Sequence, residues 1–484
     1  MANLIFPDPI SDEAYLIGRE AELETFEVNL LQNIRRPFLI VGERRIGKTS
    51  LQTVSVSRLS RKTKDKIIPI VIPTVTGISS ASDLAIEVLQ AFCRHFQINL
   101  YDLGIIAPNQ SFPIPPYGVF IQTLSNIIKG SEDKTFVLCI DEWDTILVKL
   151  KSDSDETDRI FGLIDSLVDA RHHLPIVLSL TMTLLPEKLQ ESYGSRAILQ
   201  TCEYIQVLPL ELPDSQKLIY SVFDTAYHAD QAAINRLHEL SGGNPYILKL
   251  LLKYLLDERR KNPSTDQILP EDIENILPKA VADPQANGVL ANIYDVHFKP
   301  EEQKKLLCLM ALQAKPIGLE DLHYLGNNYS RAARELAQRG YLSINQHSLT
   351  WRMEYFYHWL IEWVRFESEI YKYDIGKLAD ILESDLHIIA ATHQVTLKNE
   401  TIDLTPSEYQ TLIVLAQKSG QIVTRDEIID QLYPKTAGDV NNASIDSLIS
   451  RLRNKLKDDT HHPRYIITRS GEGYILNHCL IIQN

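Results

Sequence analysis

The sequence has 484 residues, of which 44% are hydrophobic and 23% are charged, and its net charge is −14. This composition excludes a disordered chain, and the length predicts roughly three to four domains. Proteins that bind nucleic acid often carry an excess of positive charge. Any contact of this acidic chain with DNA therefore requires a local basic patch, and we expect its affinity to depend on salt.

The beginning of the chain and its cysteines predict a cytoplasmic protein without a membrane span. Residues 1–9 contain no basic segment followed by a long apolar run, so we expect no signal peptide. No apolar run approaches the ~18 residues of a membrane helix. The five cysteines are scattered and form no C-x-x-C pair, which favours a reducing compartment without structural zinc or disulfides.

Residues 36–50 predict a nucleotide site. They read as a buried strand, a loop bounded by glycines and the start of a helix, and they fit the pattern G-x-x-x-x-G-K-[ST]. Backbone N–H groups of such a loop cradle phosphate, the lysine reaches the β- and γ-phosphates, and the threonine hydroxyl ligates Mg²⁺. The alternative is a chance match in an ordinary strand–turn–helix. The nucleotide-binding residues predicted from this stretch are Gly42, Arg45, Gly47, Lys48, Thr49 and Ser50.

A second apolar run, 135–140, ends in Asp141 and Glu142. A run of this kind is typical of a strand buried on both faces, and open α/β sheets bind ligands at the carboxyl ends of their strands. We expect Asp141 to hold Mg²⁺ through water, and Glu142 to orient and deprotonate the attacking water, with Lys48 as the second catalytic residue. The alternative is a strand that happens to end in acidic turn residues.

Three further runs predict strands of the same sheet. Residues 66–72 contain Pro69, which favours an edge strand. Residues 174–183 end in hydroxyl side chains, and Thr181 is the candidate for a contact with the γ-phosphate or its water, against ordinary capping of the strand. Residues 204–208 form the last run. Because the strands alternate with helical segments, we predict an α/β P-loop fold with a parallel sheet, and residues 104–117 as a surface loop.

A helical region, 213–282, is interrupted by the sequence Gly-Gly-Asn-Pro at 242–245. Together with Ile-Gly-Arg-Glu at 17–20 and the two stretches described, this region resembles the STAND branch of the AAA+ ATPases. The resemblance implies a helical lid, ATP and ADP as ligands, slow ATP hydrolysis that works as a switch, and self-association in the ATP state. It also implies that Gly18 and Arg19 pack near adenine and that Pro245 senses the nucleotide.

Residues 289–366 predict a winged-helix domain of the kind that follows the lid in STAND proteins. Expected helices are 301–313, one that opens at 316–319, and 328–340, and a hairpin follows from 341. Residues 367–386 read as a helical linker.

The last part of the chain, 387–484, predicts a second winged helix. A hairpin comes first, then a helix with a capping box at 405–408, helices 425–432 and 442–457, and a final hairpin at 465–476. The sequences 404–409, 420–425, 449–456 and 471–474 resemble the DNA-binding domain of OmpR-type response regulators. The resemblance implies that the third helix enters the major groove of double-stranded DNA. A winged helix that binds protein is the alternative. The predicted DNA-binding residues are Asn442, Ser447, Ser450, Arg451, Arg453 and Arg469.

We therefore predict five regions: a P-loop ATPase domain (1–212), a lid (213–288), a STAND-type winged helix (289–366), a linker (367–386) and an OmpR-type winged helix (387–484). The predicted function is an ATP-dependent, nucleotide-switched regulator of transcription, with RNA polymerase as a further partner. Two alternatives stay open. One is a STAND-type sensor in defence or signalling, and the other is an AAA+ ATPase that acts on origins or transposons.

Overall fold

The computed structural model describes most of the chain, and by contact density the chain divides into two compact units. One unit contains 1–286 with the short segments 338–341 and 352–356, and the other contains the remaining residues. The described residues are 9–32, 36–72, 75–99, 117–131, 133–150, 153–169, 174–183, 192–194, 196–224, 226–261, 263, 265–313, 315–319, 321–364, 369, 372–373, 375, 378, 386–390, 392–398, 400–434, 442–477 and 479–482.

A five-stranded parallel sheet forms the centre of the first unit, with the strand order β2-β3-β4-β1-β5. All five strands lie where the apolar runs predict them, and β2, which contains Pro69, lies at the edge as expected. Every residue of β1 and β4 is buried, because helices cover both faces. The strands are β1 (Phe38–Gly42), β2 (Ile67–Ile72), β3 (Thr135–Ile140), β4 (Ile176–Met182) and β5 (Glu203–Val207).

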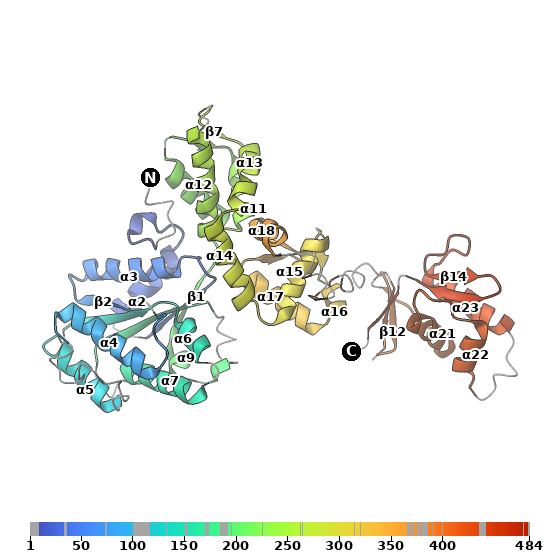
Figure 1. The fold of residues 1–484 in the computed structure, drawn as a ribbon, viewed down its shortest axis with the longest axis horizontal. Helices are drawn as coiled ribbons and strands as arrows, with labels where there is room; N and C mark the ends of the chain where they lie inside the picture. The colour runs from blue at the N-terminus through green and yellow to red at the C-terminus, as the bar shows by residue number, and fades with distance from the viewer. Residues whose placement is uncertain are drawn as a thin grey trace. The chain divides into compact units, whose positions relative to one another are not determined.

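Two hydrophobic clusters attach the helices to the sheet, one on each face (Figure 1). On one face α2 (Glu20–Leu31) and α3 (Lys48–Lys62) bury residues against β1 and β5. The other face is covered by a larger set. This set consists of α4 (Ala81–Phe96), α5 (Tyr117–Ile128), α6 (Trp143–Lys149), α7 (Ser154–Val168) and α9 (Ala197–Thr201). The predicted α/β P-loop core is therefore confirmed.

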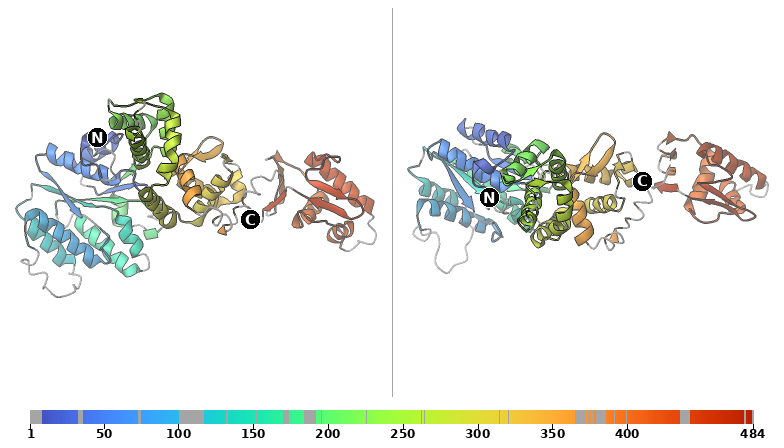
Figure 2. Two further views of the ribbon diagram at one scale, coloured as in Figure 1. Left: turned by 45° about the horizontal axis from the view of Figure 1, so that its top comes forward. Right: turned by 90° about the horizontal axis from the view of Figure 1, so that it is seen from above.

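A helical lid follows β5, and its helices lie side by side in the green part of Figures 1 and 2. Asp230 caps one helix through its side chain, and Gly242 ends that helix in a left-handed conformation at φ 58°. A short pairing of β6 (His228–Ala229) with β7 (Gln267–Ile268) joins the lid's two connections. The lid helices are α10 (Leu212–Phe223), α11 (Gln231–Ser241), α12 (Pro245–Lys261) and α13 (Pro270–Val281).

The region predicted as the first winged helix contains helices and a three-stranded antiparallel sheet, in the order β8-β10-β9. Helix α15 (Glu301–Gln313) has the predicted bounds, and α17 (Asn327–Gln338) ends two residues before the predicted end. The prediction of a helix opening at 316–319 is wrong in its position, because strand β8 (Ile317–Gly318) comes first and α16 (Asp321–Leu325) is only one short helix. The remaining elements are α14 (Pro284–Asn292), the π-helix η4 (Ile293–His297), β9 (Leu342–Ile344), β10 (Ser348–Trp351) and α18 (Glu354–Trp363).

Part of this region belongs to the ATPase unit. Segments 338–341 and 352–356, on either side of the β9–β10 hairpin, belong to the ATPase unit. A winged-helix assignment for this region stays a prediction. The predicted loop at 104–117 and most of the predicted linker at 367–386 lie outside the described residues.

The described residues of the C-terminal domain form three helices and two sheets. Helices α21 (Pro406–Gln417) and α22 (Arg425–Leu432) begin with capping boxes, and α23 (Asn442–Leu456) ends one residue before the predicted end. The final hairpin pairs β14 (Ile466–Arg469) with β15 (Gly473–Leu476), as predicted. Two strands of the four-stranded sheet are not predicted from the sequence, β11 (Leu386–Ile389) and β16 (Cys479–Ile482). They pair in parallel beside the predicted hairpin of β12 (Gln394–Leu397) and β13 (Glu400–Thr401).

Helices long and apolar enough to cross a membrane do not occur in the part of the chain that the structure describes.

Candidate functional site

The phosphate loop connects β1 to α3, and its lysine lies inside the protein. Gly47 precedes the helix at φ 105°, a conformation that favours glycine. Lys48 is 8% exposed, and its ammonium donates to the carbonyl oxygens of Gly42 at 3.0 Å and of Glu43 at 2.9 Å. An ammonium has three N–H donors, so these two bonds orient Lys48 and leave a donor for a phosphate oxygen.

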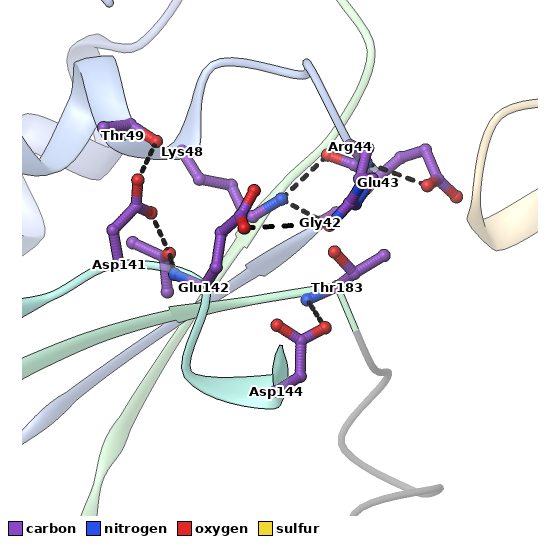
Figure 3. Close-up of polar contacts among 10 residues, drawn as sticks. Gly42, Glu43, Arg44, Lys48, Thr49, Asp141, Glu142, Asp144 and Thr183 are labelled. Carbon is purple, nitrogen blue, oxygen red and sulfur yellow. Dashed lines mark hydrogen bonds and ion pairs between the residues drawn. The ribbon is translucent and has the colours of Figure 1, made fainter. Parts of the chain in front are cut away.

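Two hydroxyl groups hold the first acidic residue (Figure 3). Thr49 Oγ1 donates to Asp141 Oδ2 at 2.8 Å, and Thr181 Oγ1 donates to Asp141 Oδ1. The backbone N–H of Glu142 donates to Thr181 Oγ1 at 2.9 Å. The loop helix, β3 and β4 thus meet at one point, where the sequence places Thr49 and Asp141 as metal ligands. Thr181 is fully buried and its hydroxyl contacts the acidic pair, so the structure gives it a role in orienting Asp141.

Glu142 stands at the start of α6 in a left-handed conformation, at φ 51°. Residues other than glycine adopt this conformation with strain, and such strain is found mostly at functional sites. Its side chain is half exposed and forms an ion pair of 3.8 Å with Arg44 of the phosphate loop. The carboxylate that is predicted to activate water therefore lies beside the loop (Figure 3).

The sequence predicts no role for Asp144 and Thr183, which lie in the same place. Asp144 is 4% exposed, and its Oδ2 accepts a hydrogen bond of 2.9 Å from the backbone N–H of Thr183, directly after β4 (Figure 3). Asp144 belongs to the acidic turn that begins at Asp141, and this proximity is the only signal in the sequence. Thr183 directly follows the carboxyl end of β4, whereas Thr181 lies within the strand.

Burial and charge oppose each other at this site. Burial lowers the pKa of the Lys48 ammonium, while Asp144, Glu43 and Asp141 act to raise it. Burial raises the pKa of Asp144, while the Thr183 N–H and Lys48 act to lower it. The nearby carboxylates therefore offset part of the cost of burying the charged Lys48.

Gly18 and Arg19 lie at the base of the loop. At Gly18, φ is 68° and a Cβ would lie 2.8 Å from Asp214 of the lid, so only glycine fits. Arg19 is 5% exposed and donates to the carbonyl oxygens of Leu208 at 2.8 Å and of Ile46 at 3.3 Å. Its guanidinium therefore fixes the phosphate loop to the segment after β5. The predicted contact of Gly18 and Arg19 with adenine stays a prediction.

The Gly-Gly-Asn-Pro sequence attaches the lid to the sheet. A Cβ at Gly243 would lie 2.0 Å from Leu210 O, and the Gly243 carbonyl accepts from Leu210 N at 2.8 Å. Asn244 Oδ1 accepts from the N–H of Tyr246, and Pro245 begins α12. These contacts place the predicted sensor Pro245 at the junction, but its contact with nucleotide stays a prediction.

Two further predicted residues of the loop contact other segments. The Arg45 guanidinium lies 5.6 Å from the centre of the Tyr246 ring, which connects the loop to the lid next to Pro245. Ser50 Oγ accepts a hydrogen bond of 2.9 Å from the N–H of Ile10, so it holds the N-terminal segment.

In the C-terminal domain, α23 buries an apolar face and exposes the opposite one. Asn442, Ser447 and Ser450 are exposed, as expected for residues that face DNA. The side chain of Arg451 is 60% exposed, and its Nε lies 3.6 Å from Oε1 of Glu408 on α21. The exposed residues of the helix are therefore mainly small and polar, with one aspartate and one arginine among them.

Arg453 and Arg469 differ in their surroundings, although both are predicted to contact DNA. Arg453 is half-buried and donates to Ile466 O at 2.6 Å and to Thr468 Oγ1 at 2.8 Å, so it attaches the hairpin to α23. Arg469 is exposed at the end of β14. The geometry therefore gives Arg453 a role in holding the β14–β15 hairpin, which is the wing of this domain, and leaves Arg469 accessible to a ligand.

Comparison with known families assigns both regions. Residues 16–251 match the family described as an ATPase domain predominantly from Archaea, and residues 399–476 match the family described as transcriptional regulatory protein, C terminal. The chain joins a P-loop ATPase domain to an OmpR-type winged-helix DNA-binding domain. These matches do not show membership of the STAND branch.

Solved structures similar to the two domains are known. The Walker-type ATPase PABY2304 of Pyrococcus abyssi is 18% identical, with a TM-score of 0.50, over 74% of this chain and 99% of that one. The ORC2 protein of Aeropyrum pernix is 11% identical over 76% and 98%, with a TM-score of 0.49. The DNA-binding domain of Klebsiella pneumoniae RstA, solved in complex with the RstA box, is 34% identical over 19% and 92%, with a TM-score of 0.19. At 18% identity, the first of these supports the ATPase fold and nothing finer.

Proposed function

We propose that this protein is a transcriptional regulator whose affinity for DNA depends on the nucleotide bound at the phosphate loop. The observation that carries the proposal is the coexistence in one chain of a buried, preoriented Lys48 and a winged helix whose α23 exposes a polar face. The first feature binds triphosphates in P-loop proteins, and the second binds duplex DNA in OmpR-type domains.

At the nucleotide site, Lys48 binds the β- and γ-phosphates, and the N–H groups of the loop cradle them. Thr49 and Asp141 offer the hydroxyl and carboxylate oxygens that suit Mg²⁺, which is usually bound by phosphates together with only one or two protein groups. Among the described residues, no cluster of three or more His, Cys, Asp or Glu side chains could hold a metal ion. Mg²⁺ held there would neutralise charge on the phosphates.

Hydrolysis needs a base near the γ-phosphate, and Glu142 is the residue we assign. Its carboxylate lies at the carboxyl end of β3 beside the loop, and Thr181 orients its backbone through the Glu142 N–H. Thr181 acts indirectly in this scheme. We assign the contact with the γ-phosphate, predicted for Thr181, to the hydroxyl of Thr183, which lies directly after β4. Slow turnover would reset a switch whose ATP state self-associates and engages DNA and RNA polymerase in the cytoplasm.

The test measures DNA affinity of the full chain with ATP, with ADP and without nucleotide. Genome-wide mapping of bound DNA first identifies a site. We expect the affinity of the protein for that site to differ between ATP and ADP. We expect the Glu142→Gln protein to keep, in the presence of ATP, the affinity that the wild type has with ATP. Nucleotide-indifferent binding would reject the proposal. Uniform coating of DNA, in place of discrete sites near promoters, would favour the ATPase of DNA transactions.

A further inference from the structure

Two short segments from beyond the lid belong to the ATPase unit, and each contributes an arginine. They are 338–341 and 352–356, and they flank the β9–β10 hairpin. Arg339 contacts the phosphate loop, and Arg352 contacts the Gly-Gly-Asn-Pro sequence of the lid. Neither family match reaches these segments, since the ATPase match ends at residue 251.

The contact of Arg339 is a buried ion pair with Glu43. Arg339 Nε donates to Glu43 Oε2 at 2.5 Å, and the two side chains are 8% and 2% exposed. Glu43 Oε1 accepts from the N–H of Arg44 at 2.8 Å, and the Glu43 carbonyl accepts from Lys48. One residue of the loop therefore contacts both the catalytic lysine and an arginine almost 300 residues later in the chain.

The surroundings of Arg339 hold it in place. The guanidinium lies 5.5 Å from the centre of the Tyr341 ring, and that ring is 1% exposed. Gly340, at φ 84°, packs so closely on Pro209 that a Cβ would lie 2.6 Å from its Cγ. This segment is thus packed between the loop and the chain that leaves β5.

The second attachment lies at the other end of the hairpin. Arg352 Nε donates to the Gly242 carbonyl at 3.3 Å, and a Cβ at Gly242 would lie 2.9 Å from Arg352 O. The N–H groups of Arg352 and Met353 both donate to the Tyr341 carbonyl, which joins the two segments. The base of the hairpin is therefore bonded at once to the phosphate loop and to the lid.

We propose that Arg339 is a positioning residue of the nucleotide site, which acts through Glu43 on the loop and on Lys48, and that this ion pair couples nucleotide binding to the β9–β10 hairpin. A carboxylate beside bound phosphates repels them unless a cation neutralises it, and Arg339 is that cation. Although burial raises the pKa of Glu43, Arg339 and the Arg44 N–H lower it overall, which keeps the carboxylate charged. Because coupling is reciprocal, displacement of the hairpin weakens nucleotide binding, and bound nucleotide changes the stability of the contacts that fix the hairpin.

The inference rests on the proposed function only in that the loop binds nucleotide. Its test is a double-mutant cycle in the full-length protein, with affinity for ATP and ADP measured by calorimetry. We expect Arg339→Met, which leaves Glu43 charged and unpaired, to weaken both affinities about tenfold or more. Glu43→Gln combined with Arg339→Met removes the unpaired charge and should restore affinity to within about threefold of the wild type. Arg334→Met, on the exposed side of α17, is the matched control and should change nothing.

Wild-type-like affinity of a folded Arg339→Met protein would overturn the proposal, as would equal losses in the single and double variants. A second measurement needs no variant: amide hydrogen exchange of the wild type with and without ATP. We expect ATP to change exchange at 339–341 and 352–353 together with the loop, and protection confined to the loop would also overturn the proposal. DNA is absent from both measurements, so a regulator whose DNA affinity ignores nucleotide would leave these outcomes unaffected.

Discussion

At the phosphate loop, charged side chains are held by backbone groups and hydroxyls around one place, whereas on α23 they hold the framework of their own domain together. Lys48, Asp141 and Asp144 are held by bonds that orient them toward one place. On α23, Arg453 holds the wing and Lys455 donates to Glu408 at 2.7 Å. The same kinds of residue thus form a ligand site in one region and a scaffold in the other.

The charge of each region agrees with this difference. Residues 387–484 contain 10 Lys and Arg against 11 Asp and Glu, so the negative charge of the chain lies almost entirely outside the DNA-binding domain. A neutral domain with few free cations gains little from the phosphate backbone. We infer that DNA binding depends on the exposed polar face of α23, on Arg451 and on Arg469. The following predictions test the comparison, first at the phosphate loop, where the expected effects are largest, and then in the C-terminal domain.

Loss of the lysine should break the nucleotide site. Lys48→Ala removes a charge-assisted hydrogen bond to phosphate inside a buried site, and we expect ATP affinity to fall on the order of 100-fold, or ~2.7 kcal/mol. Calorimetric titration measures it. Lys62→Ala is the control, because Lys62 ends the same helix at the surface, paired with Glu27. Retained affinity in Lys48→Ala would remove this loop as the site.

The base should affect turnover and leave binding unchanged. Glu142→Gln keeps the shape of the side chain and removes the proton acceptor, so we expect kcat to fall by roughly 10²–10⁴ with nucleotide affinity preserved. Single-turnover hydrolysis measures the chemical step. Turnover at the wild-type rate would reject Glu142 as the base.

Arg453 should act on the stability of the wing. Arg453→Ala removes the hydrogen bonds to Ile466 O and Thr468, and we expect the local free energy of opening at 465–476 to fall by about 1–3 kcal/mol. Hydrogen exchange of that hairpin in the full chain measures it. A loss of DNA affinity without faster exchange would show that Arg453 contacts DNA directly.

Arg451 should act on DNA alone. Its side chain is mostly exposed and its ion pair with Glu408 is long, so Arg451→Ala should leave exchange of α23 unchanged. We expect weaker DNA binding and a salt dependence reduced by about one counterion. Unchanged affinity and slope would exclude a phosphate contact from this residue.

The smallest effect concerns pH. Burial raises the pKa of Glu408, but hydrogen bonds from Lys455 and Thr405 lower it below its ordinary value of 4.5 overall. A lowered folded-state pKa contributes stability above pH 4.5 that is lost as the pH falls through the folded-state value. The measurement is amide hydrogen exchange at 405–456 in wild type and Glu408→Gln at equal pH. The exchange rates of the two proteins should become equal in acid and should differ above pH 4.5. A difference in exchange that does not change with pH would show that the charge of Glu408 does not stabilise this domain.

Much of the fold could be predicted because its signals are local. Strand β1 is an apolar run that ends in Gly42, β3 is an apolar run followed by Asp141, and α21 begins with a capping box at Thr405. The strands β11 and β16 escaped prediction because each is four residues long and is stabilised by pairing with a segment about 90 residues away. The position of the first helix after 316 was wrong because β8 is held by β10, and local propensity carries no signal of that pairing.

The sequence by itself determined the phosphate loop, the acidic turn at Asp141 and the order of the two assigned domains, because each depends on residues adjacent in the chain. Only the tertiary structure decided how their side chains are used. It directed Thr181 to Asp141, Arg453 to the wing and Arg339 to Glu43. These contacts join segments between 13 and 296 residues apart, and the partner of a charged side chain is fixed by packing and burial, which the neighbouring residues do not encode.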